Sequence, residues 1–221
     1  MPSFISSRHF EGSFPLPLTI DNAITIYEDR VLSWFLNIAA TLKGDVRADF
    51  VSLMVIASYF EGFAIMRLGQ SSKNQSRDFF AYGLKDVVKP HFQGTEEILD
   101  SIADVLYDDM RCGLFHSGMT RVGIGLDRGT EEKSTPELEA TMSDDGRIRI
   151  TMNVPKLLEL VRWHFVEYLA QLRNPAELEL RENFRKGWNL REELKKGDVV
   201  VGQTPFYIPE NVGTDTTDAE S

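Results

Sequence analysis

Four side chains that could do chemistry lie close together in the segment LYDDMRCGLFHSG, residues 106–118: Asp109, Arg111, Cys112 and His116. An arginine offers a planar, permanently charged fork for phosphate oxygens, and histidine is the side chain that titrates unaided near neutral pH. Arg111 and His116 could therefore cleave a phosphodiester. His116 would move a proton at a ribose 2′-hydroxyl or at the leaving oxygen, and Arg111 would stabilise the charge on the phosphate.

Three other interpretations fit the same residues. Cations are favoured at the end of a helix, so Arg111 and His116 could be a helix cap and a surface ion pair. Asp109, Cys112 and His116 share one helical face, which suits a metal ion, but they are only three ligands without a second cluster. Cys112 could be a nucleophile paired with His116, although nothing nearby resembles an oxyanion hole and its apolar neighbours favour a core position.

Amphipathic helices must position these residues. Apolar side chains recur at three- and four-residue spacings after Asp21, a candidate cap, and predict a helix over residues 21–43. The same spacing predicts further helices, which are residues 46–68, 78–88, 95–114, 155–172 and 175–186. Arg111 and His116 lie about 140° apart around the helix of residues 95–114. We expect Gly113 to loosen that helix so that the two side chains converge.

The apolar period changes from helical to alternating after Met119. Residues 122–126 predict a strand, and residues 138–142 and 148–152 predict a hairpin around the turn of residues 144–146. The expected fold class is mainly α: a helical bundle with an inserted small antiparallel β-sheet and additional C-terminal helices. We expect one helical domain at residues 21–186 with the β insert at 119–152, between an N-terminal extension (1–20) and a C-terminal extension (187–221) that ends in an acidic, disordered tail.

One acid, Glu61, lies within the nearly apolar helix of residues 46–68. A buried carboxylate costs several kcal/mol unless it is paired, so Glu61 needs a partner. Arg67 is poorly placed for this, whereas Arg111 on a neighbouring helix is a suitable mate. The pair could serve catalysis or be purely structural.

Composition limits the partners of this acidic chain. Its net charge is −10 with a pI near 4.9, which argues against broad coating of duplex DNA or of an anionic membrane. One cysteine excludes an internal disulfide framework and fits a reducing compartment. The first residues lack the apolar run of a signal peptide, so we expect a soluble cytoplasmic protein.

Basic residues gather locally in the segment RENFRKGWNLREELKK, residues 181–196, with Phe184 and Trp188 between them. Basic groups interleaved with aromatic rings suit single-stranded RNA, because the backbone charge and the base stacking both contribute. The alternative is a solvated amphipathic helix with Phe184 and Trp188 in the core or at a dimer contact.

The run of residues 111–116, RCGLFH, resembles the motif of an arginine, four to six residues and a histidine that marks the HEPN (higher eukaryotes and prokaryotes nucleotide-binding) superfamily. The preceding Leu106-Tyr107, the late position in a four-helix pattern and the acid Glu61 on an early core helix add to the likeness. The resemblance covers about residues 21–118 and implies a HEPN-like up-down four-helix bundle, with the β insert and the later helices outside the shared core. Many active members have a polar residue, commonly asparagine, directly after the arginine, and this chain has Cys112 there.

The resemblance implies a metal-independent endoribonuclease without a cofactor, often a toxin or a phage-defence component. Two subunits would form a composite active site and leave a 2′,3′-cyclic phosphate. Arg111, His116 and Glu61 would be catalytic, and Arg111, Tyr107 and Cys112 would contact the RNA. A homodimer is implied, with an antitoxin or a nucleotidyltransferase as a further partner. Other family members are inactive binding modules, which is the alternative function.

Overall fold

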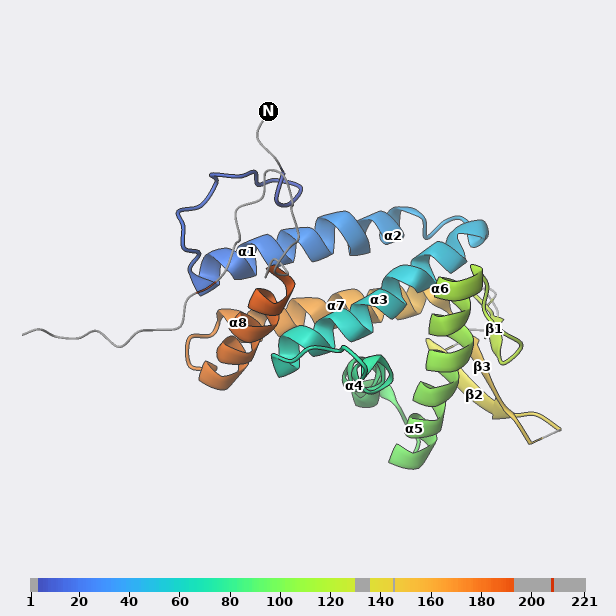
Figure 1. Cartoon of the computed structure of the whole chain (residues 1–221). Helices are drawn as coiled ribbons and strands as arrows, with labels where there is room; N and C mark the ends of the chain where they lie inside the picture. The colour runs from blue at the N-terminus through green and yellow to red at the C-terminus, as the bar shows by residue number, and fades with distance from the viewer. Residues whose placement is uncertain (1–3, 130–135, 145, 193–207, 209–221) are drawn as a thin grey trace, which may run out of the picture.

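The computed structural model describes residues 4–129, 136–144, 146–192 and 208 (Figure 1). Helices dominate the described residues. They are α1 (Ile20–Val31), α2 (Asn37–Thr41), α3 (Asp49–Leu68), α4 (Ser76–Val88), α5 (Glu96–Val105), α6 (Cys112–Ser117), α7 (Val154–Arg173) and α8 (Leu178–Glu192). The strands are β1 (Ile124–Leu126), β2 (Leu138–Met142) and β3 (Ile148–Met152). The predicted mainly α class is confirmed, as are the predicted helices, although the last one, expected at residues 175–186, begins at Leu178 and continues to Glu192.

Two of the predicted helices contain a π-helical segment. Leu32–Leu36 joins α1 to α2, and Leu106–Arg111 joins α5 to α6, so each pair is one continuous helix with a wider turn inside it. The first of these helices is capped by Thr19, whose hydroxyl accepts a hydrogen bond from the amide of Asn22 at 3.2 Å. The cap expected at Asp21 is therefore wrong: Asp21 lies inside the first turn, where its charge still suits the helix dipole.

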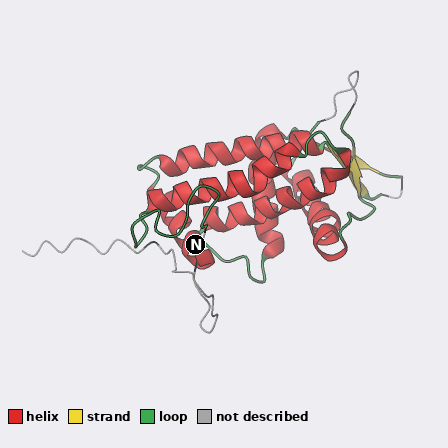
Figure 2. Ribbon diagram, turned by 90° about the horizontal axis from the view of Figure 1, so that it is seen from above, coloured by secondary structure: helices red, strands yellow, loops and turns green. Residues whose placement is uncertain are grey.

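The helices cross at different angles. In Figure 1 the α1–α2 helix, α3 and α7 extend along similar directions, whereas α4 is seen nearly end-on and the α5–α6 helix crosses the others. Figure 2, turned by 90°, shows the same steep crossings. Gly83 allows a close crossing, because a Cβ placed there would lie 2.1 Å from the carbonyl oxygen of Phe60, so α4 crosses α3 with the two backbones in contact.

The small sheet is mixed, with the strand order β1-β3-β2. The predicted hairpin is confirmed, because β2 pairs antiparallel with β3 and Leu138 lies opposite Met152. The expectation of an antiparallel sheet is wrong for β1, which pairs parallel with β3. Just after β1, Arg128 pairs with Asp49 on α3, with nitrogen–oxygen distances of 2.6 and 3.0 Å.

Helix α3 lies at the centre of the core. Among the described residues, one helical stretch, Val46–Leu68, is long and apolar enough to cross a membrane, with a mean hydropathy of 1.5. It contacts α4, α7 and α8, and 56% of its apolar window is buried inside the molecule, as in the core helix of a soluble protein. Its burial places Phe60 and Phe63 in the core and leaves a narrow face, including Glu61 and Gly62, partly open to solvent.

The chain segments outside the expected domain are packed on it where they are described. Residues 5–8 fold over α1, and the carboxylate of Asp29, with none of its side chain exposed, accepts hydrogen bonds from the hydroxyl of Ser7 and the amide of Arg8 at 2.8 to 3.0 Å. The expected boundary at residue 186 falls inside the single helix α8. The predicted acidic tail lies outside the described residues.

Candidate functional site

The helix that carries the motif is unbroken through Gly113. The π-helical segment ends at Arg111, and α6 continues to Gly118, whose φ of 72° ends the helix in the left-handed region. A Cβ at Gly113 would lie 2.5 Å from the carbonyl oxygen of Met119. The lack of a side chain at Gly113 therefore lets the backbone at Met119, just after the helix, pack directly against the helix. The expectation that it loosens the helix and lets Arg111 and His116 converge is wrong.

Arg111 is paired with Glu61, as predicted from the isolated acid on α3. An Nη of Arg111 donates to a carboxylate oxygen of Glu61 at 3.1 Å, and the side chains are 23% and 21% exposed. Burial alone would lower the pKa of Arg111, but the hydrogen bond and the charge of Glu61 raise that pKa above its usual value. The other carboxylate oxygen of Glu61 accepts a hydrogen bond from the Ser72 hydroxyl at 2.8 Å. Arg111 is thus a fully charged group held in one place.

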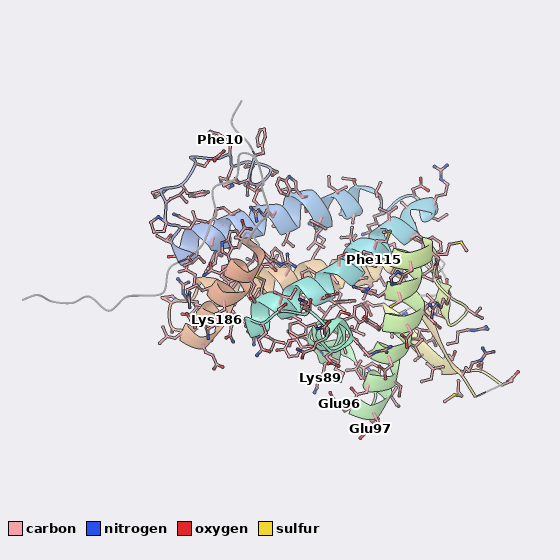
Figure 3. The ribbon with its side chains drawn as sticks, viewed as in Figure 1. Phe10, Lys89, Glu96, Glu97, Phe115 and Lys186 are labelled. Carbon is pink, nitrogen blue, oxygen red and sulfur yellow. The ribbon has the colours of Figure 1, made fainter. Side chains whose placement is uncertain are left out.

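Two aromatic rings support the same guanidinium. The carbon at its centre lies 5.5 Å from the ring centroid of Tyr107 and 5.2 Å from that of Phe115, both within the range of a cation–π contact. Tyr107 is itself fixed, because its hydroxyl lies 2.6 Å from that of Ser76 and Arg77 covers its ring at 4.6 Å. Tyr107 therefore orients Arg111, whereas the half-exposed Phe115, which Figure 3 places between α6 and α3, forms part of the open surface.

The other motif residues lie apart from this pair. His116 is exposed on α6 and makes no hydrogen bond or ion pair with the described residues, so one chain does not bring it to Arg111. Cys112 is partly buried and free. The carboxylate of Asp109 lies against Gly123, where an added Cβ would come within 2.4 Å of it. Among the residues described, no three His, Cys, Asp or Glu side chains are grouped so that they could hold a metal ion.

A pocket of about 180 Å³ opens beside the Arg111–Glu61 pair. Its remaining lining comes from Phe115, from Ala57, Ser58, Gly62 and Ile65 on α3, and from Arg191 on α8. The arrangement offers charged guanidinium groups and a carboxylate around a small space with an apolar side wall. That chemistry suits a singly charged anion such as a phosphodiester.

Sequence reasoning missed Ser58, Ser72 and Arg191 as members of this site. Ser58 and Ser72 had no distinguishing neighbours in the sequence. Arg191 belonged to the basic segment of residues 181–196, but nothing in the sequence shows that α8 lies along α3.

The aromatic residues of that basic segment are core residues within the described part of the chain. Phe184 and Trp188 are 0% and 1% exposed, so they cannot stack on RNA bases, and the alternative of an amphipathic helix is confirmed for residues up to 192. Arg185 and Lys186 pair with Glu182 on the same helix. Residues 181–192 therefore form a packed helix whose charges are largely used within the chain.

A scan with protein-family models and searches of the curated proteins and of the solved structures find no match to this chain.

Proposed function

We propose that this protein is a metal-independent endoribonuclease of the HEPN type. The proposal rests chiefly on one observation: Arg111 is held fully charged at an open pocket by Glu61 and two aromatic rings, with His116 exposed on the next turns of the same helix. A preorganised cation at the phosphate and a solvent-accessible imidazole are the two groups that ribose-assisted cleavage needs.

The reaction is a transesterification within the RNA strand. A histidine takes the proton of a ribose 2′-hydroxyl, and O2′ attacks the adjacent phosphorus. The bond from phosphorus to the 5′-oxygen of the next nucleotide breaks. That oxygen receives a proton from a second group, which acts as the general acid. The products are a 2′,3′-cyclic phosphate and a 5′-hydroxyl end, and Arg111 stabilises the charge that builds on the phosphorus oxygens.

A homodimer supplies what one chain lacks. Arg111 ends the π-helical segment and His116 lies in α6, and five residues of an ideal α-helix turn by about 140° net, so the histidine that acts on a phosphate at Arg111 comes from the other subunit. Exposed apolar side chains support this arrangement. Phe115 in the pocket lining is 45% exposed, and Trp34, Phe35 and Ile38 on the first helix are 45%, 46% and 55% exposed. Phe35 lines a second, apolar hollow that shares Ser58, Gly62 and Arg191 with the Arg111 pocket.

The decisive experiment compares RNA cleavage by the unaltered protein, His116→Ala and the control His91→Ala, which removes an exposed histidine of the η3 turn (Lys89–His91). We expect His116→Ala to lower the cleavage rate by about 100-fold or more, because general acid–base catalysis contributes that much. His91→Ala should cleave normally, and all three should unfold at the same temperature. Cleavage retained by His116→Ala would overturn the proposal, and cleavage abolished by a chelator would replace it with a metal-dependent reaction.

The dimer has its own test. Phe35→Asp should convert a dimer into a monomer in light scattering after size exclusion, and the same change should abolish cleavage because the composite site is lost. Trp163→Asp, at a residue 50% exposed on α7, is the matched control and should stay dimeric. An unaltered protein that is monomeric but cleaves RNA would refute the composite site.

A second candidate function is favoured by the same ion pair. Because Arg111 already has a partner within the chain, the site also suits a non-catalytic module that binds a nucleotide, an antitoxin or a nucleotidyltransferase. Expression in a bacterial cytoplasm, the compartment we propose for the protein, separates the two. Growth arrest that His116→Ala relieves supports the ribonuclease, and an equal phenotype of both proteins supports the module.

A further inference from the structure

Arg191 extends from α8 to the pocket that Arg111 and Glu61 line. It is an exposed residue near the end of the helix, and it is in no hydrogen bond or ion pair with the described residues. A Cβ added to Gly62 on α3 would lie 3.2 Å from an Nη of Arg191. The guanidinium therefore lies against α3 at the one position of that face where the side chain is a hydrogen.

The packing of α8 fixes this placement. A Cβ at Gly187 would lie 2.6 Å from the carbonyl oxygen of Ile65, so α8 contacts the backbone of α3 directly. The neighbouring Glu192 is bound by Arg30 on α1 at 2.6 Å, and Arg30 also covers the ring of Trp188 at 5.2 Å. Glu192 is tied to α1, and Arg191, about 100° away around the helix, projects towards Gly62 and the pocket.

The charges around the pocket are not balanced. Glu61 supplies one negative charge, which Arg111 neutralises at 3.1 Å, and Arg191 adds a second positive charge without a carboxylate of its own. The pocket therefore carries one net positive charge, which matches the single negative charge of a phosphodiester. The other polar group of the lining is the hydroxyl of Ser58, which donates to the carbonyl oxygen of Met54 on its own helix.

We propose that Arg191 is a second phosphate-binding residue of this site and that its ligand is a backbone phosphate of a single-stranded RNA. The inference deepens the proposed function and rests on it for the identity of the strand. Arg111, which is paired with Glu61, binds one side of the phosphate group, and Arg191 binds the other side. Helix α8 is thereby part of the substrate site, although it lies outside the part of the chain that resembles the HEPN superfamily.

The test measures RNA binding separately from cleavage. All proteins carry His116→Ala so that the RNA stays intact, and the probe is a fluorescent single-stranded RNA oligonucleotide titrated at several salt concentrations. Arg191→Gln is compared with Lys186→Gln, which removes a positive charge from the same helix at a residue 52% exposed that lies beside Gly69, at the far end of α3. Arg191→Lys keeps the charge but loses the planar fork.

We expect Arg191→Gln to bind RNA about tenfold more weakly than the His116→Ala parent, since a hydrogen bond to a charged group is worth about that factor. The slope of log Kd against log salt should fall by about 0.7, the value for one lost phosphate contact on a single strand. Arg191→Lys should be intermediate and Lys186→Gln unchanged. Equal affinity and slope for Arg191→Gln and the parent, or no RNA binding by the parent, would overturn the inference. If the protein with its native His116 does not cleave RNA, but Arg191→Gln still weakens RNA binding by the His116→Ala parent, the ribonuclease is rejected and the anion site is kept.

Discussion

A double-mutant cycle on Glu61 and Arg111 tests whether this pair holds the site together. The structure sets the expected size. Two charges about 4 Å apart attract by about 4 kcal/mol at an effective dielectric constant of about 20, and desolvation offsets part of that. Exposed pairs couple by about 0.2–1 kcal/mol, and breaking fully buried pairs costs about 3–5 kcal/mol. With side chains 23% and 21% exposed, the pair lies between these limits, and we expect a coupling of about 1.5 kcal/mol.

The variants are Glu61→Gln, Arg111→Gln and the two combined, with the free energy of unfolding measured in urea. Glu61→Gln keeps an acceptor for the Ser72 hydroxyl, so the cycle isolates the charge pair. Glu61→Gln alone should lower the melting temperature by about 5 °C for a chain of this size. The exposed pair of Asp45 and Arg47, 41% and 86% exposed, is the matched control and should couple by less than about 0.5 kcal/mol. A coupling as small as the control's would refute the role of Glu61 in holding Arg111.

Three other predictions concern stability and are measured by denaturant unfolding. Asp29→Asn should cost about 3 kcal/mol at pH 7. Burial alone would raise the pKa of Asp29, but hydrogen bonds from residues 6–8 and Ser33 lower it far below its usual value. The stability that the Asp29 carboxylate supplies is therefore present above about pH 4 and lost as the pH falls further. The difference in free energy of unfolding between the unaltered protein and Asp29→Asn should narrow at pH 3, and a constant difference would contradict this. Gly83→Ala should cost about 3 kcal/mol or more, because its Cβ would lie 2.1 Å from the carbonyl oxygen of Phe60. The control Gly44→Ala, whose Cβ would have nothing within 4 Å, should leave the stability unchanged. Similar losses for both variants would reject the close helix crossing. Trp188→Ala should cost about 4 kcal/mol, since the side chain is 1% exposed, and a loss below about 1 kcal/mol would mean that α8 is not part of the core.

The sequence was most informative where local pattern decides the structure. The apolar spacing in residues 95–114 predicted the motif helix, and the two alternating runs around residues 144–146 predicted the β2–β3 hairpin. An unpaired acid on an apolar helix was also informative, because its burial demands a cation, and Arg111 proved to be that cation.

The failures come from contacts between distant segments. β1 pairs with β3, which lies later in the chain, and no residue pattern in β1 itself records that partner or the parallel direction. Gly113 was interpreted as a loosening of the helix, but its conformation is helical and its small size serves the passing chain at Met119. Arg191 reaches the site only because glycines on α3 and α8 let the two helices approach, and such a contact has no signature within either helix.

The π-helical segment Leu106–Arg111 also bears on how the motif could have arisen and how it could be lost. A π turn accommodates one residue more than an α turn over nearly the same length, so it has the form of a single-residue insertion absorbed by a helix. Deleting one residue between Leu106 and Met110 would restore an ordinary α turn and leave Arg111 facing Glu61, because the wider turn already takes up the extra residue. Losing one residue from α5 with the π turn kept would instead rotate Arg111 by about 100° relative to the packed start of that helix, and Glu61 would then face a different side chain. The motif helix therefore tolerates a change of length at the π turn better than in its α-helical part.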